Sequence, residues 1–144
     1  MKNITVPIKV PRYLWQYVRR NFGEFAAFPR GSFVNYILHR LLTKRPPNAE
    51  PRRAPSAPIL HIVIPDCRFK KPEYYNYLTP RAEIKIRKAL FETFDLDMWR
   101  SLQRLIRQGM RIEHAVHHWC EQVGIDIEGR EAVRKRFYRM RKRG

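Results

Sequence analysis

The sequence predicts a mostly helical protein with short β-strands, built as an N-terminal strand–helix–helix module followed by a C-terminal bundle of helices. Three observations lead to this fold class. Apolar residues alternate at the start of the chain, which is typical of a strand with one buried face. Through most of the second half they recur at intervals of three and four residues, which is typical of amphipathic helices. A proline-rich segment separates the two parts.

That segment, residues 46–58, contains five prolines and almost no apolar side chains. Because proline fixes φ and has no backbone donor, this composition predicts an extended, semi-rigid linker. With 144 residues, the chain can hold one ordinary domain or two very small ones. We therefore expect one module over residues 1–45, the linker over 46–58, and a second module over 59–144 that begins with a short strand.

The first module opens with an alternating segment that Pro11 closes, and this segment predicts a strand. A first helix should follow and stop at Gly23, and a second should begin after an N-cap at Ser32. The apolar faces are expected to consist of Ile4, Val6, Ile8 and Val10 in the strand, Tyr13, Leu14, Tyr17, Val18 and Phe22 in the first helix, and Phe33, Tyr36, Ile37, Leu41 and Leu42 in the second.

The second module begins with a short apolar run that predicts another strand, and an irregular stretch follows it. Asp95 and Asp97 have the character of helix caps, because an apolar stripe starts beside them. The expected elements are a strand over 59–64 and helices over 81–94, 96–108, 111–123 and 128–143. The helix over 111–123 should carry a single apolar stripe, which consists of Ile112, Ala115, Val116, Trp119, Cys120 and Val123.

The charge of the chain indicates an anionic partner. Thirty Lys and Arg residues stand against 13 Asp and Glu residues, and the formal net charge is +17. A compact body with that charge repels itself unless a partner neutralises it, and nucleic acid is the commonest such partner. Basic residues are found in both modules, which suggests two contact surfaces.

Several other classes of protein are disfavoured. The sequence contains neither a glycine-rich phosphate loop nor a Gly-x-Ser-x-Gly motif, so we expect no enzyme, no catalytic residues and no cofactor. Cys67 and Cys120 are far apart in the chain, as expected of reduced thiols in a cytoplasmic, nucleoid-associated protein. No apolar run approaches the roughly 18 residues of a membrane-spanning helix, so no membrane partner is expected.

Two clusters of side chains have competing interpretations. His114 and His118 stand four residues apart, a spacing that zinc sites use, but we favour surface histidines and expect no metal. Aromatic side chains beside Lys70 and Lys71 could stack on unpaired bases or anchor an irregular loop, and we favour the anchor. These aromatic residues are Tyr74, Tyr75 and Tyr77.

Residues 3–44 resemble the ribbon-helix-helix family of bacterial, plasmid and phage DNA-binding proteins. The resemblance rests on the alternating strand, the closing Pro11 and the second helix capped at Gly31-Ser32. It implies that two chains form a homodimer by pairing their strands into a ribbon in the DNA major groove. It also implies that Asn3, Thr5 and Lys9 face the bases and that Ser32 lies beside a phosphate. Alternatively, the strand pairs with residues 59–64 inside one monomer.

The last expected helix combines one apolar seam, Val133, Phe137 and Met140, with a densely basic surface. Together with the helix before it, it loosely resembles a helix-turn-helix recognition helix. Such a surface suits a DNA groove or backbone, although a solvated basic terminus is the alternative. The residues expected to contact DNA are Arg130, Arg134, Lys135, Tyr138, Arg139, Arg141 and Lys142.

The sequence thus predicts a protein that binds double-stranded DNA without catalysis. The family resemblance implies a repressor-like transcription regulator or an accessory factor of a mobile element such as a plasmid, phage or transposon. The alternatives are an RNA-binding protein and a structural nucleoprotein that binds without sequence preference.

Overall fold

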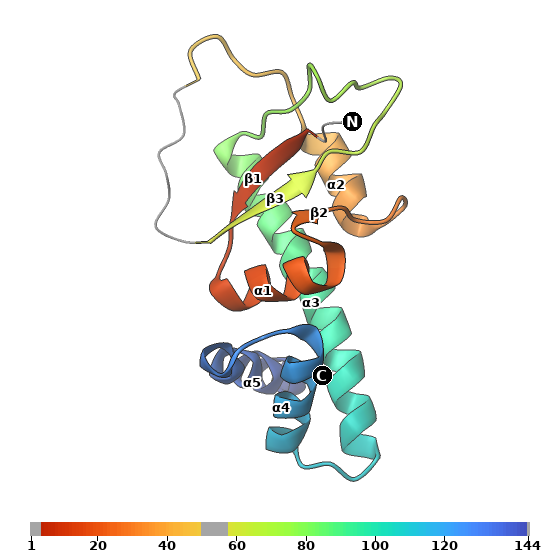
Figure 1. The fold of residues 1–144 in the computed structure, drawn as a ribbon, viewed down its shortest axis with the longest axis vertical. Coiled ribbons are helices and arrows are strands. Elements are labelled where there is room, and N and C mark those ends of the chain that lie inside the picture. Colours follow the sequence, from red (N-terminus) through yellow and green to blue (C-terminus); the bar gives the residue numbers. More distant parts are fainter. Residues whose placement is uncertain (1–3, 50–57, 144) are drawn as a thin grey trace.

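A computed structural model of the chain describes residues 4–49 and 58–143. Within those residues the structure is mostly helical with short strands, which confirms the expected class (Figure 1). The elements are β1 (Thr5–Lys9), α1 (Arg12–Phe22), β2 (Phe25–Ala26), α2 (Phe33–Leu41), β3 (Ile59–Val63), α3 (Pro80–Arg107), α4 (Ile112–Val123) and α5 (Ile127–Arg143). Asn3 and most of the proline-rich segment, residues 50–57, lie outside the described residues.

The three strands form one sheet in the order β1-β3-β2. β1 and β3 are antiparallel, with Val6 opposite Ile62, whereas β2 runs parallel to β3 with Phe25 opposite His61. The strand that follows the proline-rich segment is therefore the central strand of a sheet that the first part of the chain completes. The pairing of β1 is the alternative that the sequence left open: its partner strand is in the same chain.

The apolar face and both edges of β1 have neighbours in the same chain. Val6 and Ile8 are buried, as the alternation predicted. The inner edge pairs with β3, and on the other edge the Arg87 Nε donates to the Lys9 carbonyl at 2.7 Å. Pro7, in the middle of the strand, has no backbone N–H to offer. The expectation of paired chains rested on an unpaired strand edge and an uncovered apolar face. In the structure, β3 of the same chain pairs with one edge of β1, and the apolar face of β1 is buried.

A single 28-residue helix, α3, replaces the two helices expected over 81–94 and 96–108. It begins after Thr79, whose side chain accepts a hydrogen bond from the Ala82 N–H at 3.1 Å. The expectation that Asp95 and Asp97 are caps is wrong, because both lie in the middle of α3. Their carboxylates bind Arg136 of α5 and Tyr17 of α1, so they do not compete for the backbone of α3.

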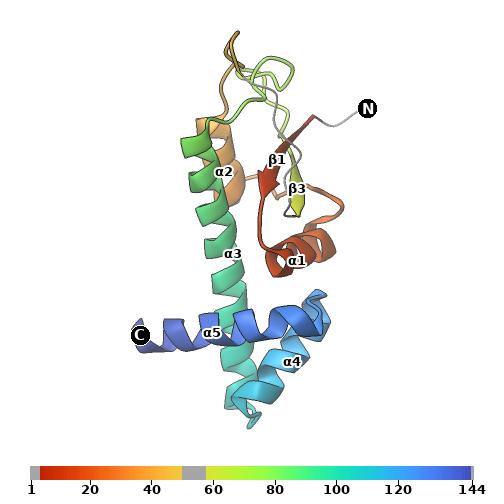
Figure 2. The same ribbon diagram turned by 90° about the vertical axis from the view of Figure 1, so that its left-hand side faces the viewer.

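The long helix α3 joins the two ends of the molecule. The sheet and α2 lie along its N-terminal half, and α4 and α5 pack on its C-terminal half (Figures 1 and 2). Aromatic rings connect the two ends. Tyr17 and Phe94 have centroids 5.0 Å apart, and Phe94 and Trp119 have centroids 5.4 Å apart, both edge to face. The described residues therefore share one continuous core.

The apolar stripes expected in α1, α4 and α5 are confirmed, but the stripe expected in α2 is displaced. Phe33 and Tyr36, expected to be buried, are 49% and 56% exposed, whereas Val34 and Leu38 are buried. The rotation of α2 is fixed by Asn35, whose side-chain amide donates to the Phe28 carbonyl at 2.9 Å. A buried hydrogen bond of this kind sets which face of a short helix is turned inward.

Candidate nucleic-acid interface

The first turn of α5 is held firmly against α1. Asp126 accepts hydrogen bonds from the Gly129 N–H at 3.2 Å and from the Gln16 side chain at 2.8 Å, and it pairs with Arg12 at 3.2 Å. The bond from Gln16, followed by those from Gly129 and Arg12, holds the pKa of Asp126 below its usual range. The start of the helix is therefore fixed in position relative to the rest of the molecule.

The middle of α5 is docked on α3 and α4 through the predicted seam. Val133 and Phe137 are fully buried and Met140 is partly buried. Arg136 stands over the Phe91 ring at 4.3 Å while its guanidinium binds Asp95. A helix fixed along one side in this way presents its opposite side in a defined orientation.

Two of the residues expected to contact DNA have partners inside the protein. Arg130 donates to the His117 Nδ1 at 2.7 Å and lies 3.9 Å from a Glu121 oxygen, with only 15% of its side chain exposed. Arg134 binds Glu131 at 2.9 Å, and this bond is the main cause of the lowered pKa of Glu131. Arg130 therefore connects α5 to α4, whereas the Arg134–Glu131 pair lies within α5. Both arginines have less freedom to meet a ligand.

The remaining residues of this set form an exposed cluster, here called the α5 basic surface. In residues 4–49 and 58–143, none of its cations has a carboxylate within ion-pair distance. The Tyr138 ring lies between two guanidinium groups, with Arg134 at 5.7 Å and Arg141 at 5.9 Å from its centroid. The α5 basic surface consists of Lys135, Tyr138, Arg139, Arg141 and Lys142.

A second basic feature was missed by the sequence interpretation. A groove of about 420 Å³ on the C-terminal half of α3, here called the α3 arginine groove, is lined by Trp99, Arg100, Gln103, Arg104, Arg107 and Gln108. Trp99 stacks against Phe137 at 5.3 Å, so the groove borders α5. The signal was present in the sequence, because these arginines are spaced four and three residues apart and residues 98–112 contain no acid.

The N-terminal candidates are not brought together with α5. Thr5 is half-buried and Lys9 is exposed, both on the outer face of the sheet. In Figure 2 the sheet lies on one side of α3, and the C-terminal end of α5 projects past the other side. Ser32 caps α2 as predicted, because its hydroxyl accepts the Asn35 N–H at 3.3 Å.

The histidines and cysteines form no recognisable metal centre. His114, His117 and His118 are exposed on α4, and the described residues contain no group of three or more potential ligands close enough to hold an ion. Cys120 is buried, and burial raises the pKa of its thiol to about 11. At neutral pH this thiol is therefore protonated, which is unfavourable for metal binding.

The tyrosines of the irregular segment have mixed surroundings. Tyr75 is half-buried between two cations, with the Lys44 and Lys70 Nζ atoms 5.5 and 5.6 Å from its ring centroid. Tyr77 pairs with Thr43 through backbone hydrogen bonds, so these two tyrosines anchor the segment as favoured. Tyr74, in contrast, is 65% exposed.

Across the two described ranges, none of the helices has a stretch both long and apolar enough to cross a membrane. Comparison of the chain with known protein families, with curated protein sequences and with solved structures gave no significant match.

Proposed function

We propose that the protein binds double-stranded DNA through the α5 basic surface, with the α3 arginine groove as an adjoining contact. One observation supports this most. The acids near the middle of α5 are already engaged, Asp95 by Arg136 and Glu131 by Arg134, while Lys135, Arg139, Arg141 and Lys142 are left exposed without a carboxylate partner among the described residues.

Phosphates are the natural ligands of such a surface. Cations that neutralise phosphates release condensed counterions, which is the main source of affinity for DNA in basic proteins. The groove adds Gln103 and Gln108, which can donate to phosphates or to base edges. A helix docked along one seam also lowers the entropy lost on binding, because its orientation is set before the ligand arrives.

Duplex DNA is favoured over duplex RNA by the shape of the surface. The C-terminal end of α5 projects beyond α3 (Figure 2), and Arg141, Lys142 and Arg143 at this end are exposed. The major groove of B-form DNA admits an α-helix, whereas the major groove of A-form RNA is too narrow for side chains to read.

The biological part of the proposal rests on the family resemblance of residues 3–44. It assigns the protein to the cytoplasm, at the nucleoid, as a repressor-like regulator or an accessory factor of a mobile element. Thr5 and Lys9 would then make a second contact in a homodimer. Because one edge of β1 pairs with β3 of the same chain, a second chain would have to join the sheet at the other edge of β1. That contact would engage a different stretch of duplex from α5, since the two surfaces lie on opposite sides of α3.

The test is a titration of the full chain against a labelled DNA duplex, the same single strand and an RNA duplex of the same sequence, each at several salt concentrations. We expect the DNA duplex to bind most tightly, with a slope of log affinity against log salt of about −5 or steeper. A slope near −1, or a preference for RNA or single strands, would contradict the proposal. Equal affinity for unrelated duplexes would assign the protein to the structural nucleoproteins.

A further inference from the structure

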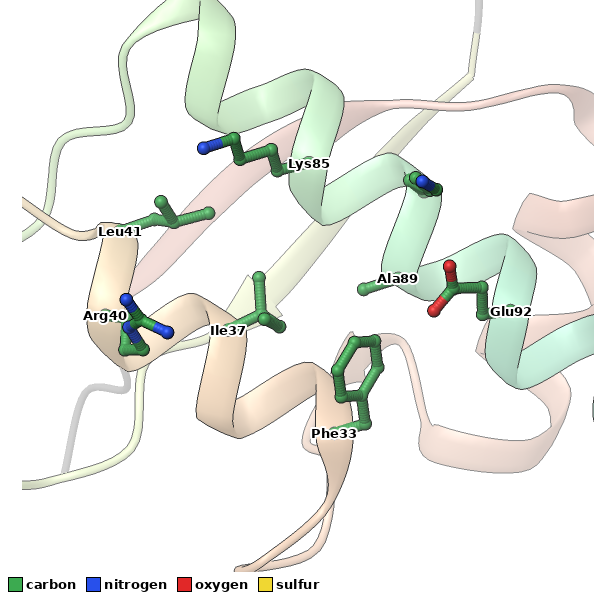
Figure 3. A pocket seen from close by; sticks show the side chains of 8 residues that line it. Phe33, Ile37, Arg40, Leu41, Lys85, Ala89 and Glu92 are labelled. Atoms are coloured by element: carbon green, nitrogen blue, oxygen red, sulfur yellow. The ribbon is translucent and has the colours of Figure 1, made fainter.

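A separate groove of about 310 Å³ lies between α2 and α3, toward the other end of α3 from the arginine groove. Its floor is apolar, with Phe33, Ile37 and Leu41 contributed by α2 and Ala89 by α3 (Figure 3). Charged side chains form its rim: Arg40, Lys85, Lys88 and Glu92. We call it the α2–α3 groove.

The groove exists because α2 is rotated relative to the stripe expected from the sequence. With Val34 and Leu38 turned into the core, Phe33 and Tyr36 remain outside. On α3, Ile84 lies one turn before Lys88 and is 61% exposed, but it does not line the groove. Isolated exposed apolar residues are ordinary, whereas apolar side chains grouped at a groove are typical of interaction sites.

The rim indicates the charge of that molecule. Three cations stand against one acid, and the Arg40 guanidinium lies over the exposed Tyr36 ring at 5.7 Å. The charges are also unevenly placed. Arg40 and Lys85 lie beside Leu41 at one end of the groove, whereas Glu92 lies beside Phe33 at the other (Figure 3).

We propose that the α2–α3 groove binds an amphipathic segment of a partner protein, with two or three apolar side chains on the floor and carboxylates at the Leu41 end. The stretch from Lys85 to Glu92 is about 10 Å along the helix axis, which is room for about two turns of a bound helix. Two antiparallel helices that form a groove with an apolar floor suit the helix-in-groove mode of recognition.

Other occupants fit this groove less well. A second copy of the chain has a net charge of +17 and would be repelled by the cationic rim. Nucleic acid would satisfy the cations but would leave the floor of Phe33, Ile37 and Leu41 without an apolar partner. The experiment below decides between the peptide and nucleic acid.

The experiment selects binders to the full chain from a displayed random-peptide library and measures the affinity of the selected peptides by fluorescence anisotropy. Lys85→Glu with Lys88→Glu should weaken their binding about tenfold, since charge pairs at an interface rim contribute modestly and two are reversed. Phe33→Ala, which changes only an exposed ring, should weaken it about tenfold as well. Arg68→Glu with Lys71→Glu is the control, because it makes the same charge change on exposed residues outside the groove.

Enrichment of peptides that combine apolar and acidic residues, with weaker binding only in the groove variants, would support the proposal. Selection of peptides without acids, or equal binding by the groove variants, would overturn it. The same variants are titrated with duplex DNA. If the Lys85 and Lys88 changes lower DNA affinity more than the control does, the groove is a nucleic-acid contact and the peptide proposal fails, while DNA binding itself stands.

Discussion

Arg136 of α5 and Asp95 in the middle of α3 form a two-point ion pair. The Arg136 Nε lies 2.6 Å from one carboxylate oxygen of Asp95, and a terminal guanidinium nitrogen lies 2.8 Å from the other. The two side chains are only 21% and 23% exposed. Arg136 therefore pairs with an acid on another helix, unlike the exposed cations that follow it in α5.

We expect Arg136→Met, which keeps an unbranched side chain beside Phe91, to lower the free energy of unfolding by about 1–3 kcal/mol, because it leaves a partly buried carboxylate without its donor. Urea denaturation measures the change. Asp95→Asn alone and the double variant complete a mutant cycle. A coupling energy near zero would show that the pair adds nothing to the docking of α5.

The α5 basic surface should affect affinity without affecting stability. Arg139→Gln, Arg141→Gln and Lys142→Gln together should leave the melting temperature nearly unchanged, because all three are exposed and glutamine keeps helix propensity. The salt slope for duplex DNA should become shallower by up to about 0.9 for each lost phosphate contact. The matched control replaces Arg45, Arg68 and Lys71 by glutamine. An equal loss in the control would mean that net charge alone drives binding.

The α3 arginine groove should contribute to the same interface. Arg104→Gln with Arg107→Gln should reduce the affinity for duplex DNA by a factor of about two to ten, as expected when exposed arginines lose their contacts with DNA phosphates. If the groove adjoins the α5 surface on one ligand, combining these changes with the α5 triple variant should reduce affinity further. Anisotropy titrations at fixed salt compare the sets. An unchanged affinity would confine the interface to α5.

Tyr17 should make the protein sensitive to alkaline pH. Burial, and then its 2.6 Å hydrogen bond to Asp97, raises the pKa of Tyr17 above the usual value near 10. The folded state thus holds this proton more tightly than the unfolded chain. The resulting stability is complete below pH 10 and is lost as pH rises toward the higher native pKa.

We therefore expect the free energy of unfolding to fall above about pH 10 and to fall less steeply in Tyr17→Phe. Urea midpoints measured from neutral to alkaline pH test this. Tyr13, whose pKa burial also raises, acts in the same direction, so the variant should reduce the slope and not abolish it. The same slope in both proteins would contradict the assignment to Tyr17.

Gly129 lies where α5 packs closely against Tyr13 of α1. A Cβ at this position would come within 2.7 Å of the Ile125 Cγ2 and 2.9 Å of the Tyr13 Cβ. Alanine normally stabilises a helix by about 1 kcal/mol relative to glycine. Here we expect Gly129→Ala to destabilise the protein, because such overpacking costs about 1–3 kcal/mol. A higher thermal midpoint would show that the two helices can move apart freely.

Features that depend on neighbouring residues could be predicted from the sequence. The alternation of β1, the stripe of α4, the seam of α5 and the cap at Ser32 are all local patterns, and each is confirmed. The high density of cations after Val133 could be predicted in the same way. Whether these cations have carboxylate partners among the described residues could not be predicted, because that depends on which acids the other helices bring near them.

Features that depend on distant residues could not be predicted. Asp95 and Asp97 resemble caps until Arg136 and Tyr17, 41 and 80 residues away, are seen to bind them. The central position of β3 depends on a partner strand on the other side of the proline-rich segment. The rotation of α2 depends on the Asn35 bond to Phe28, which no periodicity reveals.

Because α3 is one continuous helix, it fixes the distance between the two grooves that it lines. Lys88 in the α2–α3 groove and Arg104 in the arginine groove are separated by 16 residues, which correspond to about 24 Å along the axis. The helix keeps this distance constant, because it has no hinge between its two ends. A protein segment bound in the α2–α3 groove would therefore lie at a fixed distance, roughly seven base pairs of duplex, from the DNA bound at the arginine groove.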